Sequence, residues 1–440
     1  MNDKNEANDG MTPEGFAEFL RQFLEKQGGI DPEQLAKAAG LPSDPAAIQS
    51  MLHQFQSALN NSDENTSGGV NWKVATDQAR AIAKNGAYAI SQTQRDNIAN
   101  ALSIGTLWLD AATSIAGVTA EPKLLTREMW VADATGLYQQ MSAPVAEQMA
   151  AALTETMQQN LPEDMAGLSA TAGRFMRSAG GAMFAMQLGQ ALGKLSGEVM
   201  SGGDIGLPIF PERPALVPQN IDEFISDFDI ESDQAYIYLV VRELAYARLF
   251  KHAKWLRDAV ILQIAAYASE ISIDVEHMKE VSEGLDLNNP EELRMAIDSG
   301  AMITKRTEEQ ERAVASIETL LALIEGWVEH VTEDATKLLP RSLAVSEAVR
   351  RRRADGGPAE KTFGTLVGLQ LRPRRLRESV AMWQQIHTQL GASARDALWN
   401  HPDQLPSAAE IDNPSMLVER LRNGSSGDAM DQALRDLLGE

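Results

Sequence analysis

The chain has 440 residues, of which 44% are hydrophobic, and it carries a formal net charge of −23 at pH 7. This length and hydrophobic content are sufficient for a globular protein with a substantial buried core. The negative charge argues against nucleic acid and anionic membranes as general partners, because both are polyanions. Cysteine is absent, which excludes disulfides, thiolate zinc sites and cysteine nucleophiles.

The N-terminal sequence gives an expectation about location. The first ten residues, MNDKNEANDG, are polar and acidic, and they lack the basic and apolar regions of a signal peptide. No uncharged apolar run reaches the length of about 18 residues that a membrane-spanning helix requires. We therefore expect a cytoplasmic protein.

Composition divides the chain into five parts. The segment SDENTSGG has no apolar residue to bury, which is typical of a linker. The predicted parts are a disordered tail (1–10), a small N-terminal helical segment (11–60), the linker (61–70), a main helical domain (71–422) and a C-terminal tail (423–440).

The main domain has helical periodicity almost throughout. Few segments alternate with period two, so we expect a mainly α protein with at most a small sheet. The proline-rich residues 202–218 cannot continue a helix, and they must pass over the surface or wrap around another element. The predicted helices cover residues 74–85, 93–116, 126–159, 166–200, 234–271 and 308–337.

One motif in the predicted helix 234–271 bears on chemistry. Residues Arg242-Glu243-Leu244-Ala245-Tyr246 keep the glutamate of the zinc-binding HExxH pattern but neither of its histidines. A guanidinium stays protonated and has no lone pair to give, and a tyrosine ligand would have to lose a proton of pKa about 10. We therefore expect that Arg242 and Tyr246 do not bind zinc in the usual way.

Five stretches, in matching order, together resemble one family. It is the zincin-like family of actinobacterial proteins that are named, on the strength of their fold, as hydrolases or zinc-dependent metalloproteases, and that are related to proteins associated with deazaflavin-coenzyme biosynthesis. The resemblance covers roughly residues 72–418 and implies a zincin-like, metallopeptidase-like helical core. It places Glu243 at the catalytic glutamate and Glu325 at the downstream acidic ligand. The stretches are residues 201–209 (SGGDIGLPI), 242–257 (RELAYARLFKHAKWLR), 323–331 (LIEGWVEHV), 368–378 (GLQLRPRRLRE) and 395–403 (RDALWNHPD).

The predicted helix around Glu325 indicates what this residue contacts. Its apolar stripe includes Leu321 and Val328, and Glu325 lies on the edge of that stripe. A buried carboxylate needs a cation or a metal as partner. If Glu325 faces the Arg242 helix, as the resemblance implies, an Arg242–Glu325 ion pair with the Tyr246 hydroxyl nearby replaces the metal. The alternative is that Glu325 lies on a solvated face and Arg242 pairs elsewhere.

A different zinc site would need other ligands. His330 is the nearest candidate partner of Glu325, but it follows Glu325 by five residues and so lies off its helical face. Histidines dispersed in this way are more often structural than metal-binding, so zinc held by Glu325 and His330 is the less favoured reading.

Two arginine groups stand out in an otherwise acidic chain. They can dock an acidic partner or neutralise carboxylates of the chain itself, and we favour neutralisation because no aromatic residues interleave for base stacking. The groups are Arg350–Arg353, and Arg372, Arg374, Arg375 and Arg377.

Three functions remain open from the sequence. The favoured one is a non-catalytic pseudo-enzyme that binds a protein or peptide partner, with no cofactor, nucleic acid or membrane. The first alternative is an active metallohydrolase with Glu243 as general base and zinc held by noncanonical ligands. The second is a scaffold that docks a partner through its N-terminal helices and arginine groups.

Overall fold

The structure is a computed structural model, and its described part comprises residues 66–67, 70–160, 181–182, 184–211, 213–227, 231–271, 306–355, 364 and 375–424. These residues belong to one compact unit, which spans Ser62–Ile271 and Arg306–Glu440. The predicted N-terminal helical segment and most of the predicted C-terminal tail lie outside the described residues. The domain boundaries drawn from composition therefore stay predictions.

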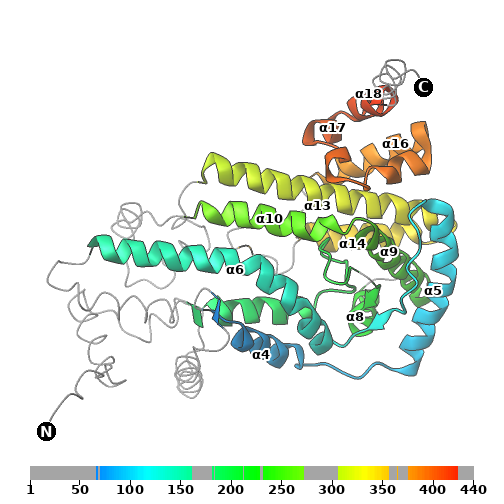
Figure 1. Cartoon of the computed structure of the whole chain (residues 1–440). Coiled ribbons are helices and arrows are strands. Elements are labelled where there is room, and N and C mark those ends of the chain that lie inside the picture. Colours follow the sequence, from blue (N-terminus) through cyan, green and yellow to red (C-terminus); the bar gives the residue numbers. More distant parts are fainter. Residues whose placement is uncertain are drawn as a thin grey trace, which may run out of the picture. The chain divides into compact units, whose positions relative to one another are not determined.

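The centre of the unit is helix α9 (Ser232–His252), in which every residue from Tyr238 to Phe250 is buried. It packs against α5 (Gln92–Ala112) and α13 (Glu308–Ala335), and α13 packs in turn against α10 (Trp255–Ser269) and α16 (Leu376–Ala397) (Figure 1). A helix that is buried on all sides is expected to be apolar. The charged residues within α9 therefore need partners inside the core.

Further helices surround this centre. Residues 184–196 are helical and approach α4 (Trp72–Ala83) so closely that a Cβ atom on Gly189 would lie 2.7 Å from the Ala75 carbonyl oxygen. Helix α4 also packs on α6 (Arg127–Asn160). The remaining described elements are α8 (Pro218–Ser226), α14 (Ser342–Asp355), the 3-10 helix η2 (Pro402–Gln404), α17 (Ala408–Asp412) and α18 (Pro414–Gly424).

The sheet content is small. Strands β1 (Thr66–Ser67) and β2 (Val70–Asn71) pair antiparallel, and β3 (Lys123–Leu124) and β4 (Ala215–Leu216) pair parallel. The free edge of β4 forms a single antiparallel bridge between Leu216 and Ser201. The prediction of a mainly helical fold with at most a small sheet is confirmed.

The predicted helix 234–271 is wrong in one respect, because it is two helices. The chain leaves helical values at Ala253, where ψ is 68°, and α10 begins at Trp255. No glycine or proline marks this break in the sequence. The indole of Trp255 donates a hydrogen bond to the carbonyl of Trp399, so the break is associated with a tertiary contact rather than with a local signal. Of the predicted helix 166–200, residues 166–180 lie outside the described part.

Within the described part of the chain, no helix has both the length and the apolar content to cross a bilayer.

Candidate functional site

The motif Arg242 to Tyr246 lies in the middle of α9, where it faces α13. Residues 242 and 246 are one helical turn apart and share a face of α9. The Arg242 Nη2 atom lies 2.7 Å from Glu325 Oε2 of α13 and donates a hydrogen bond of 2.9 Å to the Tyr246 hydroxyl. The predicted Arg242–Glu325 ion pair, with the Tyr246 hydroxyl beside it, is confirmed.

This ion pair is almost fully removed from solvent. Arg242 is 5% exposed, Glu325 1% and Tyr246 0%. Burial by itself lowers the pKa of Arg242, but the Tyr246 and Glu325 oxygens raise it by more, so the pKa lies above its ordinary value. The guanidinium therefore stays positively charged, in contact with both the Tyr246 hydroxyl and the Glu325 carboxylate.

Further ion pairs join α13 to α14. Glu329 lies one turn after Glu325, and its carboxylate pairs at 2.6 Å with Arg350 of α14, which also pairs with Glu333. Burial raises the pKa of Glu329, while the positive charges of Arg242 and Arg350 oppose this increase. Glutamates of α13 and arginines of α9 and α14 thus alternate across a largely buried interface.

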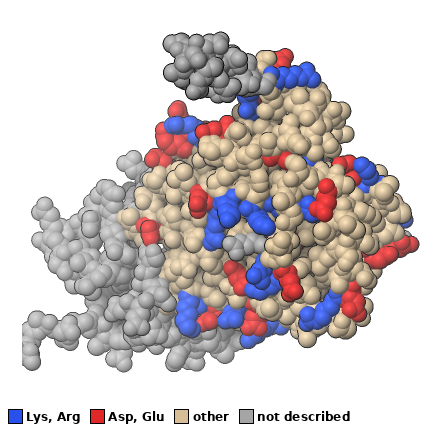
Figure 2. Space-filling model, turned by 45° about the vertical axis from the view of Figure 1, so that its right-hand side comes forward, with Lys and Arg blue, Asp and Glu red and all other residues tan. Residues whose placement is uncertain are grey.

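The arginine groups also have carboxylate partners within the chain. On the face drawn in Figure 2, basic and acidic side chains lie beside one another over much of the lower surface. Arg372, Arg374 and the side chain of Arg353 lie outside the described part, and Arg377 has no carboxylate partner among the described residues. Pairing is present for Arg350 with Glu329, Arg351 with Glu347, Arg352 with Asp204 and Arg375 with Asp412.

Glu243 has partners other than this ion pair. Its Oε1 accepts a hydrogen bond of 2.7 Å from the Ala215 backbone amide, and its Oε2 accepts one of 3.0 Å from the Gly203 amide. Burial raises the pKa of Glu243 to about 7, against the lowering effect of these amides and of the Ser201 side chain. Both carboxylate oxygens are occupied by the chain itself, and the residue is 2% exposed.

The amide of Gly203 belongs to a segment that closes the site. We call residues 201–207 (SGGDIGL) the strap. A Cβ atom on Gly203 would lie 2.3 Å from Tyr246 Cγ, and one on Gly206 would lie 2.8 Å from Glu325 Oε1. Gly206 also has a φ of 73°, which side-chain-bearing residues rarely adopt. Only glycine fits at these two positions, and the strap wraps α9 rather than passing over the surface.

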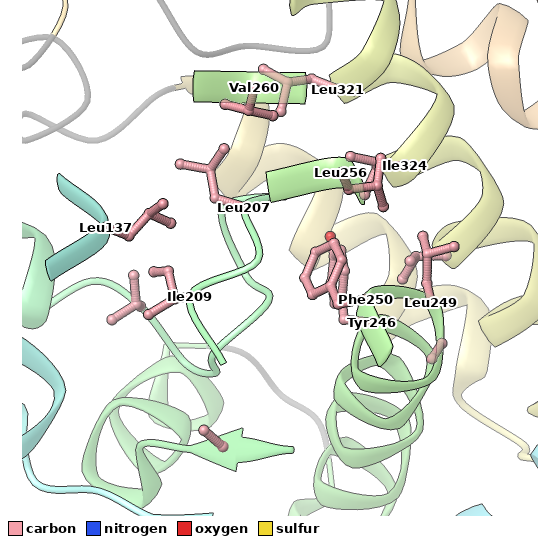
Figure 3. Close-up of a cluster of buried hydrophobic side chains, with 14 of the residues drawn as sticks. Leu137, Leu207, Ile209, Tyr246, Leu249, Phe250, Leu256, Val260, Leu321 and Ile324 are labelled. Atoms are coloured by element: carbon pink, nitrogen blue, oxygen red, sulfur yellow. The ribbon is translucent and has the colours of Figure 1, made fainter. Parts of the chain in front are cut away.

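Apolar side chains also enclose the site next to the strap glycines. Leu207 is 0% and Ile209 7% exposed, and Figure 3 shows both beside Leu137 of α6. The rings of Tyr246 and Phe250 stack with centroids 5.7 Å apart. The site is thus enclosed by packed side chains.

The structure does not bring His330 to this site. Its Nε2 atom lies 3.0 Å from Nδ1 of His387 on α16, and burial, followed by the nearby Arg395, lowers the pKa of His330 to about 4. In the described part of the chain, no three or more His, Asp or Glu side chains are grouped so that they could hold a metal ion. The described residues thus do not bring Glu325 and His330 together, and the noncanonical site that the sequence left open stays a prediction.

The reasoning from sequence missed the strap glycines and Ser201. One signal was present, because residues 201–209 form one of the five stretches that carry the family resemblance. Gly202 and Gly203 in succession also indicate a backbone that must approach another group closely. The sequence pattern does not show which group this is.

The raised pKa of Glu243 predicts a pH dependence of stability. Its folded-state pKa of about 7 exceeds the ordinary glutamate pKa of 4.5, so its stabilising contribution is complete below pH 4.5 and is lost as the pH rises to about 7. Relative to Glu243→Gln, the unfolding free energy of the wild type should fall by about 3 kcal/mol across this window. Urea unfolding of both proteins between pH 4.5 and 8 measures the difference, and parallel profiles would contradict the prediction.

The family described as zincin-like metallopeptidase matches residues 70–418. No curated protein matches the chain. The chain is similar to a crystal structure from Chloroflexus aurantiacus that is described as "a putative hydrolase with a novel fold", with a TM-score of 0.56 and 17% identity over 80% of this chain and 99% of that one. At this identity the likeness shows the fold alone. Because the family match spans most of its length, the chain belongs to the zincin-like metallopeptidase family.

Proposed function

We propose that this chain is a zincin-like pseudo-enzyme, which keeps the family fold and binds a protein or peptide partner without hydrolysing it. One observation carries the proposal: the Arg242 guanidinium lies on the ligand face of α9 and pairs at 2.7 Å with Glu325. The guanidinium thus places a fixed positive charge beside the Glu325 carboxylate, where a metal cation would otherwise bind.

The residues present do not fit zinc. Zinc is held by neutral imidazole, thiolate or carboxylate groups, and Arg242 offers none of these donors. The Glu325 carboxylate already pairs with Arg242, and both oxygens of Glu243 accept backbone amides. A zinc ion at this position would have to displace a guanidinium whose pKa is raised.

The same contacts weigh against the two alternatives. An active metallohydrolase would need Glu243 free to take a proton from water, but this carboxylate is buried under backbone amides. A scaffold that docks through its arginines would need free guanidinium groups. Arg350, Arg351, Arg352 and Arg375 are instead paired with carboxylates of the chain.

Zinc content and peptide cleavage test whether the chain lacks a metal site and hydrolytic activity. The protein is purified without a histidine tag or chelator, and zinc per chain is measured by elemental mass spectrometry beside Glu325→Ala. We expect zinc far below one per chain in both proteins and no cleavage of a mixed peptide library. Near-stoichiometric zinc in the wild type that is lost in Glu325→Ala would refute the pseudo-enzyme.

Partner binding needs its own measurement. Partners captured by the wild type are identified by cross-linking and quantitative mass spectrometry, and recovery is compared with Glu243→Gln. A pseudo-enzyme that binds near this site should show a changed recovery of at least one partner in the variant, because Glu243 orders the neighbouring backbone. Unchanged recovery in Glu243→Gln, together with loss in Arg375→Glu, would favour the scaffold.

A further inference from the structure

The strap is hydrogen-bonded to β4 in the manner of an added strand. The Gly202 amide donates to the Ala215 carbonyl at 2.8 Å, and the Val217 amide donates to the Met200 carbonyl at 2.9 Å. These bonds flank the antiparallel bridge between Ser201 and Leu216. Because β3 occupies the other edge of β4, both edges of this strand are filled by the chain itself. An extended peptide therefore finds no free edge beside Glu243.

The inner face of the strap lies directly on the residues of the site. Gly203 covers the Tyr246 ring, Gly206 covers the Glu325 carboxylate, and the Gly203 amide bonds to Glu243. The close approach is possible because neither glycine has a Cβ atom. Backbone thus occupies the space that a ligand of Arg242 or Glu325 would need.

Asp204 is a second point at which the strap is attached. Its carboxylate accepts a hydrogen bond of 3.0 Å from the Met200 amide and lies 3.7 Å from Arg352 of α14. The Arg352 guanidinium also lies over the Phe224 ring of α8, with 5.7 Å to the centroid. The strap is therefore held at two points, by Glu243 at Gly203 and by Asp204 with the Met200 amide and Arg352.

We propose that the strap is an autoinhibitory cover, which keeps the site closed independently of the missing ligand histidines, and that Glu243 is its anchor. The inference rests on the proposed function, because it assigns the glutamate at the catalytic position of the family a positioning role in place of proton transfer. A partner that engages Arg242 or Glu325 must first displace the strap, so binding at the site is coupled to strap opening.

Amide hydrogen exchange of the full-length protein tests the cover. In the wild type, peptides that span residues 200–217 should exchange as slowly as peptides from the buried part of α9. In Glu243→Ala the amides of Gly203 and Ala215 lose their acceptor, and their exchange should become at least about tenfold faster. Peptides from α4 and α6 should be unchanged.

Two further variants keep the test specific. Glu329→Ala removes another buried glutamate, which bonds to Arg350 and not to the strap, and it should leave strap exchange within about twofold of the wild type. Gly206→Ala adds a Cβ against Glu325 without touching Glu243, and it should open the strap. Gly86→Ala is its control, because Gly86 has a similar φ of 71° but nothing within 4 Å of its added Cβ.

The outcomes separate the cover from the pseudo-enzyme. Strap peptides that exchange at the rate of exposed loops in the wild type, or equally in Glu243→Ala and Glu329→Ala, would overturn the cover. The same holds if Gly206→Ala and Gly86→Ala have equal effects on the strap. A metal-free wild type with a fast-exchanging strap would retain the pseudo-enzyme and reject the cover. Stoichiometric zinc in the wild type would reject the pseudo-enzyme, whatever the exchange rate of the strap.

Discussion

Replacement of Arg242 with alanine is expected to lower the free energy of unfolding by about 3–5 kcal/mol, because it strands a carboxylate that the fold cannot hydrate. Glu325 is 1% exposed, and Glu329, on the next turn of α13, is 5% exposed. The positive charge of Arg242 stabilises the ionised form of both carboxylates, and the variant also lacks the hydrogen bond from Arg242 to the Tyr246 hydroxyl. Urea unfolding monitored by tryptophan fluorescence measures the loss.

Two controls identify the cause of this loss. Arg350→Ala removes an arginine whose side chain is 37% exposed, so water can replace part of its interaction, and the cost should be nearer about 1 kcal/mol. Arg242→Met combined with Glu325→Leu removes both charges at similar volume and should recover most of the stability lost in Arg242→Ala. A loss below about 1 kcal/mol in Arg242→Ala would show that the pair is not buried as described.

The sequence was sufficient for the helical core and for the ion pair, and physical reasons explain why. Helical periodicity is a local property, so it located α5, α13 and the start of α9 to within a few residues. It also placed Arg242 and Tyr246 on one face and Glu325 at the edge of an apolar stripe. The rule that a buried carboxylate needs a partner then joined the two helices, with the family resemblance supplying the relative orientation.

What the sequence did not reveal depends on contacts between distant segments. The break at Ala253 has no glycine or proline, and the adjacent Trp255 is held by the Trp399 carbonyl, which is far away in the chain. The sequence indicated that the segment containing the strap passes over the surface or wraps around another element, but not that Tyr246 and Glu325 occupy the space of the side chains missing at Gly203 and Gly206. Periodicity contains no information about such contacts.

The restoration of the ligand histidines, Arg242→His with Tyr246→His, is expected to give a protein that binds close to one zinc per chain. Residues 242 and 246 face Glu325, so the variant supplies two imidazoles and a carboxylate from the positions that now hold the guanidinium, phenol and carboxylate. Histidine is shorter than arginine, but bonds of about 2 Å from zinc to the imidazole nitrogens and to the carboxylate oxygen span the remaining distance. Elemental mass spectrometry after dialysis against trace zinc measures the stoichiometry.

The expected gain depends on the three positions acting together. Adding Glu325→Ala to the double variant should abolish zinc binding, whereas adding His330→Ala should not, because His330 lies against His387 and outside the site. Zinc should also raise the melting temperature of the double variant and leave that of the wild type unchanged, since an ion that binds only the folded state stabilises it. A folded double variant that takes up no zinc would mean that the fold no longer holds these positions in ligand geometry. The guanidinium would then be part of a remodelled core and not the replacement of a metal.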